Sequence, residues 1–312
     1  MVRGGCALTG AHVTRNHLVV GPGDAAYVVP DELAGHCSGF RRWAAIDEHS
    51  PSVHMRFSVC ELEPGGQVGW HVRSFEESFH LVDGEVVCDT DEGAFLLGPG
   101  DYGVVGVGAP HAWRNVGDAP ARWAEMTAPQ PRADTRHTFA VADRDRGTPI
   151  RPDVRDPRTR SFGHVSPGNM EVDKQTQDQL AVTASMRTAL LVYSGITVKM
   201  MVDSDLGADL STMFMVQYVP GGFTGPHDHP LEEAYMVVEG EVDAVFEGHE
   251  YHMTVGDIAV AGVGCPHQFS NPADVPVRWL ETQAPQPPGR HSYRFARDWT
   301  YLADALDGGT DG

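Results

Sequence analysis

The chain has 312 residues, of which 41% are hydrophobic and 21% charged, the balance of a soluble globular protein with two domains of ordinary size. The 43 Asp and Glu residues outnumber the 23 Lys and Arg residues, which gives a net charge of −20. Such an acidic surface repels phosphate groups, so we expect no nucleic-acid partner and no docking on membranes, and no apolar run is long enough to span one.

Cysteine usage and the first residues bear on where the protein works. The five cysteines include no Cys-x-x-Cys pair, a pattern that favours free thiols over a disulfide framework. The N-terminal residues lack the apolar stretch of an export signal. We therefore expect a cytoplasmic protein.

The two halves of the chain are related by an internal repeat at an offset of 156 residues. Residues 64–131 recur as residues 220–287 without an insertion, and 29 of the 68 aligned positions are identical. The motif Ala128-Pro129-Gln130-Pro131, for example, returns as Ala284-Pro285-Gln286-Pro287. Chance does not produce this agreement, so the chain is a tandem duplication of one domain.

In chain order, the local pattern predicts short strands separated by turns. Residues 54–62 and 212–219 are rich in β-branched and aromatic side chains. Strands ending at Asp83-Gly84 and at Glu239-Gly240 are each followed by another strand, which is typical of a hairpin. A short helix is conceivable over residues 171–186. The fold class we predict is all-β, with a small antiparallel barrel in each half.

A polar, proline-rich stretch separates the halves and predicts an irregular connector. The predicted division is an N-terminal domain over residues 18–131, a connector over residues 132–170 and a C-terminal domain over residues 171–295.

Four residues of the second half have the pattern of a metal site. His227 and His229 are two residues apart, so a strand would point both side chains to one face. Glu233 follows after a proline, and His267 follows a glycine-rich return. Three imidazoles and a carboxylate are ligands that suit a divalent transition metal better than calcium or magnesium.

These residues belong to two blocks that resemble the paired signature of the cupin superfamily. The first block, residues 221–240, reads Gly-x5-His-x-His-x3-Glu-x6-Gly. The second block, residues 256–271, ends in His-x3-Asn and differs from the family only at Gly262, where proline is usual. Because both halves share the pattern, the chain looks like a bicupin. The resemblance implies jelly-roll barrels and one divalent metal per chain at His227, His229, Glu233 and His267.

The first half departs from the pattern at one ligand position. His71, Glu77 and His111 are present, but Arg73 replaces the second histidine. A guanidinium stays charged and has no lone pair for a metal. We expect Arg73 to form a buried ion pair with Glu77 in place of a metal; the alternative is that Arg73 binds an anionic ligand.

Other residues of the second half are candidates for the pocket. Strand alternation places Tyr235 on the face of Glu233 and Phe269 on the face of His267. Trp279 and Glu281 alternate together. We predict Tyr235, Phe269 and Trp279 as substrate-pocket residues and Tyr235 and Glu281 as candidate acids or bases, although core packing would explain them equally well.

The first functional hypothesis is a non-haem Fe(II) dioxygenase that cleaves a small oxygenated organic molecule, with dioxygen as a second substrate. The second is an oxygen-independent isomerase, decarboxylase or amidohydrolase using Mn(II), Ni(II), Co(II) or Zn(II) as a Lewis acid. The third is a binding protein without turnover. Exposed sheet edges often pair across subunits, and many cupins are dimers, so we expect a homo-oligomer, most simply a dimer.

Overall fold

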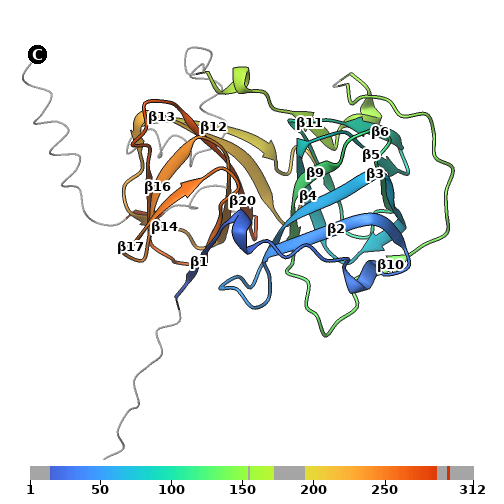
Figure 1. The fold of residues 1–312 in the computed structure, drawn as a ribbon, viewed down its shortest axis with the longest axis horizontal. Helices are drawn as coiled ribbons and strands as arrows, with labels where there is room; N and C mark the ends of the chain where they lie inside the picture. The colour runs from blue at the N-terminus through green and yellow to red at the C-terminus, as the bar shows by residue number, and fades with distance from the viewer. Residues whose placement is uncertain (1–14, 154, 172–193, 287–293, 296–312) are drawn as a thin grey trace, which may run out of the picture.

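The computed structural model describes residues 15–153, 155–171, 194–286 and 294–295. These residues form two antiparallel sheets, each curled into a barrel, and the two barrels lie side by side (Figure 1). No α-helix occurs in these ranges; the only helical segments there are four short 3-10 turns, at Pro22–Asp24, Asp31–Leu33, Pro157–Thr159 and Pro167–Met170. The predicted all-β fold with two tandem barrels is confirmed.

The first sheet has ten strands, and they come almost entirely from the N-terminal half. They are β2 (Cys37–Ile46), β3 (Arg56–Arg73), β4 (Glu76–Asp83), β5 (Val86–Thr90), β6 (Gly93–Leu97), β7 (Asp101–Val105), β8 (His111–Arg114), β9 (Ala121–Ala128), β10 (Thr138–Ala140) and β11 (Phe162–His164).

The second sheet has eleven strands. They are β1 (His17–Val20), β12 (Ser194–Val202), β13 (Thr212–Phe223), β14 (His227–Asp228), β15 (Glu232–Glu239), β16 (Glu241–Phe246), β17 (His249–Thr254), β18 (Ile258–Ala261), β19 (His267–Ser270), β20 (Val277–Ala284) and β21 (Arg294–Phe295).

Glycine turns follow β4 and β15 as predicted, but the hairpins predicted there are wrong. β4 pairs with β7 and β9 and not with β5, and β15 pairs with β18 and β20 and not with β16, because the chain crosses at each turn to another part of the sheet. Gly84 has φ 71°, and a Cβ there would lie 2.4 Å from the carbonyl oxygen of Pro120. Gly240, its repeat equivalent, has φ 74°, and a Cβ there would lie 2.8 Å from the carbonyl oxygen of Pro276. Only glycine adopts this backbone conformation without strain in so little space. The repeat therefore preserves the glycine turn that joins β4 to β5 and β15 to β16.

Each half contributes its leading strand to the sheet of the other half. β1 pairs with β18 in the second sheet, whereas β11 pairs with β7 in the first. His17 anchors β1 there, because its Nδ1 lies 2.7 Å from a carboxylate oxygen of Glu247 and its Nε2 lies 2.8 Å from the hydroxyl of Tyr251. β1 thus belongs to the second sheet, although most of it lies within the predicted N-terminal domain, which begins at residue 18.

The segment predicted as an irregular connector is partly regular. β10 pairs with β3 and β11 pairs with β7. The segment 132–170 therefore contributes two short strands to the first sheet. The helix considered for residues 171–186 lies outside the described residues except for Glu171, which has no regular structure. Among the described residues, no helix is long and apolar enough to cross a membrane.

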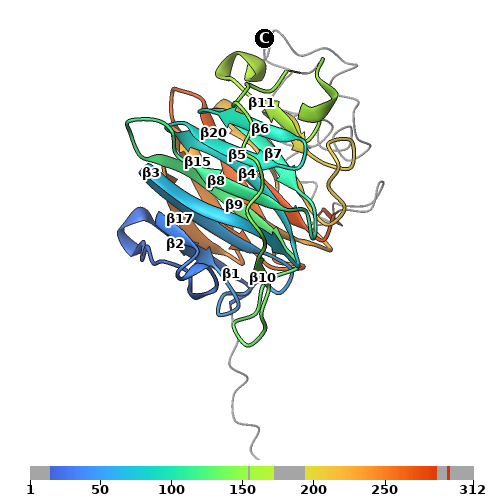
Figure 2. The same ribbon diagram turned by 90° about the vertical axis from the view of Figure 1, so that its right-hand side faces the viewer.

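The barrels pack against each other through an apolar layer and two matched carboxylates. The layer takes Ile46 and Phe57 from the first half and Leu280 from the second. Buried Glu76 accepts hydrogen bonds from the backbone N–H groups of residues 209 and 210, and buried Glu232 accepts them from residues 53 and 54, which are the repeat equivalents. Figure 2 shows the two sheets stacked in this way.

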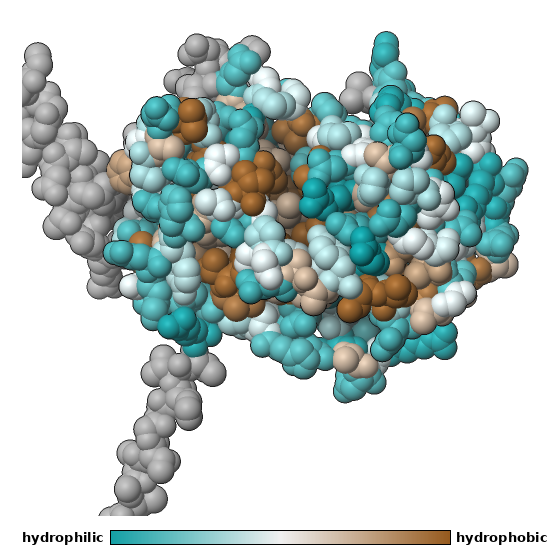
Figure 3. All heavy atoms as spheres, in the orientation of Figure 1, coloured by the Kyte–Doolittle hydropathy of each residue, from teal (hydrophilic) through white to brown (hydrophobic). Residues whose placement is uncertain are grey.

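Each barrel also has an apolar interior, whereas its outside is mixed. Within the first barrel Trp113 stacks on Trp123 with ring centroids 5.2 Å apart, and within the second Phe269 lies 5.2 Å from Trp279. On the face shown in Figure 3 most residues are hydrophilic, and the hydrophobic ones form small separate groups. Burial of the two inner faces is the main source of stability.

Candidate metal centre

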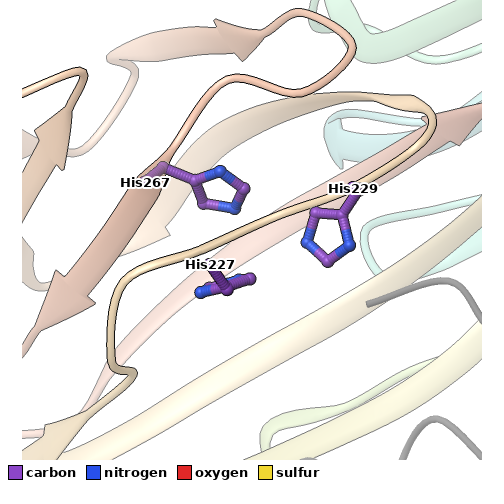
Figure 4. Close-up of side chains that lie close together, drawn as sticks. All are labelled: His227, His229 and His267. Atoms are coloured by element: carbon purple, nitrogen blue, oxygen red, sulfur yellow. The ribbon is translucent and has the colours of Figure 1, made fainter. Parts of the chain in front are cut away.

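The three histidines predicted as ligands lie close together inside the second barrel. His227 begins β14, His229 directly follows that strand, and His267 begins β19 opposite His227. Each offers a ring nitrogen, and these nitrogens all lie within 4.8 Å of one another. All three side chains are buried, and their rings turn toward a common centre (Figure 4).

Glu233 completes the group from β15. Its Oε2 lies 3.2 Å from the Nε2 atoms of both His229 and His267. Two ligand atoms in adjacent positions on one metal, at about 2.0–2.2 Å each, are separated by about 3 Å. The spacing of these donors therefore fits a single divalent transition metal.

Backbone carbonyls orient two of the imidazoles. His227 Nδ1 lies 2.7 Å from the carbonyl oxygen of Gly225, and His267 Nδ1 lies 2.9 Å from that of Cys265. A carbonyl oxygen only accepts, so each Nδ1 carries the hydrogen and each Nε2 keeps its lone pair. Such contacts fix the ring of a metal-binding histidine in the productive orientation.

The electrostatics of the group suit a bound cation. Burial, together with the nearby His267 and His229, lowers the pKa of His227 well below its usual range, so this imidazole is neutral at neutral pH. Burial alone would raise the pKa of Glu233, but His229 and His267 lower it well below its usual range. A neutral imidazole at His227 and an ionised carboxylate at Glu233 are protonation states that suit a bound metal.

Two further side chains hold the Glu233 carboxylate. The hydroxyl of Tyr235 donates to Oε2 at 2.5 Å and lies 3.1 Å from His267 Nε2. The amide of Gln283 donates to Oε1. Sequence reasoning missed Gln283, although it lies two residues after Glu281 and so faces the same side of β20. Its neighbour Thr282 points the other way, to Met55 of the first half.

A cavity of about 50 Å³ adjoins the four donors. Its wall includes the predicted pocket residues Tyr235, Phe269 and Trp279 and the candidate acid or base Glu281. The other lining residues are largely apolar and were not predicted; they are Ile196, Val198, Phe214, Val216, Tyr218 and Thr224. A cavity of about 10–15 Å³ holds one water molecule, so this cavity has room for only a few non-hydrogen atoms.

Glu281 is a second buried carboxyl group beside the metal ligands, and its pKa is shifted in the opposite direction from that of Glu233. Trp279 Nε1 donates to its Oε2 at 3.0 Å. Burial and the charge of Glu233 raise the pKa of Glu281 well above its usual range. The environments of the two carboxyl groups thus shift their pKa values in opposite directions.

The equivalent position in the first barrel has an arginine cluster instead. Arg73 donates to Glu77, lies 3.3 Å from Glu125 Oε2, and its Nε donates to His71 Nε2 at 3.1 Å. Arg73 is 4% exposed and both glutamates are 1% exposed. The expected buried ion pair with Glu77 is therefore present, and the guanidinium fills the space where the second half has His229.

Comparison with known proteins identifies the family. The cupin domain family matches the chain twice, over residues 58–127 and 214–282. The chain belongs to the cupin superfamily. With one cupin domain in each half, it is a bicupin.

Similar solved structures share this two-barrel fold. Oxalate decarboxylase of Lactobacillus farciminis, in its formate complex, matches with a TM-score of 0.62 and 16% identity over 96% of this chain and 95% of that one. Salicylate 1,2-dioxygenase of Pseudoaminobacter salicylatoxidans, as a gentisate adduct, has the same TM-score and identity over 90% of this chain and 78% of that one. At this level of identity the likeness establishes the fold.

The relatives found by sequence similarity are transcriptional regulators, whereas the similar structures are enzymes. The HTH-type transcriptional regulator PuuR of Escherichia coli (strain K12) is 30% identical over 92 residues, which are 29% of this chain and 49% of the regulator. The protein of the same name from Shigella flexneri matches equally. The matched part of the chain thus spans about half the length of these relatives.

Proposed function

We propose that the chain is a metal-dependent enzyme with one working site, in the C-terminal barrel, where His227, His229, Glu233 and His267 hold a divalent transition metal. The observation behind this proposal is the cluster of three buried imidazoles, with the carboxylate of Glu233 3.2 Å from two of them. The metal would supply Lewis acidity and, if it is iron, the means to use dioxygen. In the first barrel Arg73 occupies the corresponding space, so one metal per chain is expected.

The substrate that fits this site is a small oxygenated organic molecule. The cavity of about 50 Å³ limits its size, and the aromatic wall formed by Tyr235, Phe269 and Trp279 excludes water. Tyr235 and Gln283 hold the carboxylate of Glu233 in place, so the site is rigid before a substrate enters.

The first candidate reaction is Fe(II)-dependent oxygenation with C–C cleavage. The fold shared with salicylate 1,2-dioxygenase makes it reasonable, and the set of three histidines and one glutamate leaves room for two further ligands on an octahedral metal. Iron-loaded protein should then consume dioxygen when a catechol, an enediol or a hydroxy-keto acid is added. Manganese-loaded protein is the matched control and should not.

The second candidate is an oxygen-independent reaction, either decarboxylation or isomerisation. A specific observation favours it: Glu281, a carboxyl group with a raised pKa, borders the same cavity and can give a proton to a carbon centre. The fold is also shared with oxalate decarboxylase. Under anaerobic conditions turnover would continue for this candidate and would stop for the first, so one assay with and without oxygen separates them.

A binding protein without turnover is the remaining alternative. The partial match to the PuuR regulators supports it, because a transcriptional regulator needs no turnover. Metal bound at the four ligands, with no product formed from any oxygenated substrate in either atmosphere, would favour that alternative over both reactions. A cytoplasmic location and a homodimer remain predictions.

A further inference from the structure

The cavity beside the proposed metal centre has no positively charged side chain among the described residues of its wall. None of these residues is a lysine or an arginine, and Glu281 adds a second carboxyl group to that of Glu233. Lys199 follows Val198 on β12 and therefore faces the other side of that strand. Arg278 pairs with a glutamate and borders a different cavity. Of the groups that the structure describes, none but a bound metal would offer a positive charge to a substrate here.

The two halves of the chain differ in this respect. In the first barrel, Arg42 Nη1 lies 3.8 Å and Arg73 Nη1 lies 3.3 Å from a carboxylate oxygen of Glu125, and all three side chains are buried. The repeat equivalents of the two arginines are Val198 and His229. The second barrel therefore has an aliphatic side chain and a metal ligand where the first has two guanidinium groups.

The polar groups on the cavity wall already have partners within the protein. The hydroxyl of Tyr235 donates to Glu233, and Trp279 Nε1 donates to Glu281. The hydroxyl oxygen of Thr224 accepts a hydrogen bond of 2.9 Å from a backbone N–H. The O–H of Tyr235 and the N–H of Trp279 thus serve the protein's own carboxyl groups and not a carboxylate on a bound molecule.

Most of the remaining wall is apolar and includes Ile196, Val198, Phe214 and Val216. Burial of a carboxylate against such a surface, without a hydrogen bond or an opposite charge, is strongly unfavourable, whereas burial of an alkyl group is favourable. The carboxylate of Glu233 would also repel a second negative charge. The wall therefore selects against any carboxylate that the metal itself does not bind.

We propose that the metal centre takes substrates whose only polar groups are the two oxygens that bind the metal, with an apolar body against the wall of the cavity. This inference rests on the proposed metal centre and narrows its substrate class. Catechols and enediols without an acid group satisfy the condition. Dicarboxylates and hydroxy-keto acids, which keep a free carboxylate, do not.

Two hydroxamates of equal size test this inference by binding, without turnover. Isobutyrohydroxamate and the monohydroxamate of oxalic acid share the metal-binding group, to which the first adds an isopropyl group and the second a carboxylate. In titration calorimetry on the zinc-loaded full-length protein, we expect 1:1 binding of isobutyrohydroxamate and binding of the acid that is weaker by a factor of about ten or more. Free zinc ions should not show this preference, because an additional negative charge strengthens the attraction to a cation in water. His227→Ala, which lacks a metal ligand, should bind neither compound.

Variants of one wall residue separate charge from size. Val198→Lys places an ammonium group on the wall and should raise the affinity of the acid, relative to isobutyrohydroxamate, by a factor of about ten or more. Val198→Met is the matched control, because its side chain has nearly the length of lysine without the charge, and the acid should stay the weaker ligand. The first barrel supports this choice of position, since it accommodates a buried arginine, Arg42, at the equivalent place.

Different outcomes would overturn the inference and the proposed function. Equal or tighter binding of the acid to the zinc-loaded parent would overturn the inference and leave the metal centre intact, as would the absence of binding of either compound. An affinity ratio that Val198→Lys and Val198→Met change by the same factor would also overturn it. Protein that retains no zinc would instead contradict the proposed function, and the inference with it.

Discussion

Replacing Arg73 by alanine should destabilise the protein strongly. Arg73 is buried and contacts Glu77, Glu125 and His71, so its removal leaves two buried carboxylates with less compensation. Loss of one partner from a buried ion pair costs about 3–5 kcal/mol. Burial raises the pKa of Glu77 and the charge of Arg73 opposes this shift, so removal of Arg73 raises that pKa further, and protonation of Glu77 then relieves part of the cost.

Thermal unfolding followed by tryptophan fluorescence measures this effect. For a domain of about 150 residues, 3–5 kcal/mol corresponds to a fall in Tm of roughly 10 °C. Arg41→Ala is the matched control, since Arg41 is 49% exposed and its pairs with Glu61 and Glu63 contribute less than about 1 kcal/mol. The double variant Arg73→Met/Glu77→Gln removes both charges and should melt above Arg73→Ala.

A Tm for Arg73→Ala within about 1 °C of the parent would refute the reasoning, because no buried pair of this kind is removed so cheaply. A double variant that melts below Arg73→Ala would contradict the electrostatic explanation and favour lost packing instead.

Three further predictions concern other parts of the molecule. Gln283→Leu removes the donor to Glu233 Oε1 and should weaken metal affinity about 10–100-fold in a chelator competition, with the fold intact. Burial lowers the pKa of His80 to about 4, so the unfolded chain binds this proton more tightly, and about 3 kcal/mol of stability should be lost as pH falls from 6.5 to 4. His80→Met, which copies the second half, should flatten that part of the stability curve. Glu76→Gln and Glu232→Gln should each cost about 1.5–3 kcal/mol in urea unfolding, by similar amounts.

Each of these has a clear contrary result. Unchanged metal affinity in Gln283→Leu would mean that the amide does not position Glu233. A parallel decline of parent and His80→Met stability between pH 6.5 and 4 would assign the acid sensitivity to other groups. Widely different costs for Glu76→Gln and Glu232→Gln would show that the two contacts between the barrels are not equivalent.

The parts of the fold that sequence could predict are those that depend on local pattern and on the repeat. The turns at Gly84 and Gly240 follow from residue type, because only glycine fits a positive φ in so little space. The hairpins predicted there do not form, because the strands that flank each turn pair with more distant strands. The exchange of β1 and β11 between the sheets could not be predicted, because pairing such as His17 with Ala261 depends on packing between residues far apart in the chain.

The same distinction applies to the sites. The signature spacing indicated His227, His229, Glu233 and His267, and the structure brings their donor atoms together. Gln283 was not singled out, because one polar residue on a strand gives no sign of the side chain that it contacts. Its hydrogen bond to Glu233 becomes visible only when β15 and β20 are paired in register.

The central claim is that the chain binds one transition metal at a single site in the second half. Elemental analysis of the full-length protein, purified without chelator or His-tag, tests it most directly beside a His227→Ala variant. We predict about one metal per chain in the parent and a loss of that metal in the variant. No metal in the parent after reconstitution, or two metals per chain, would contradict the account.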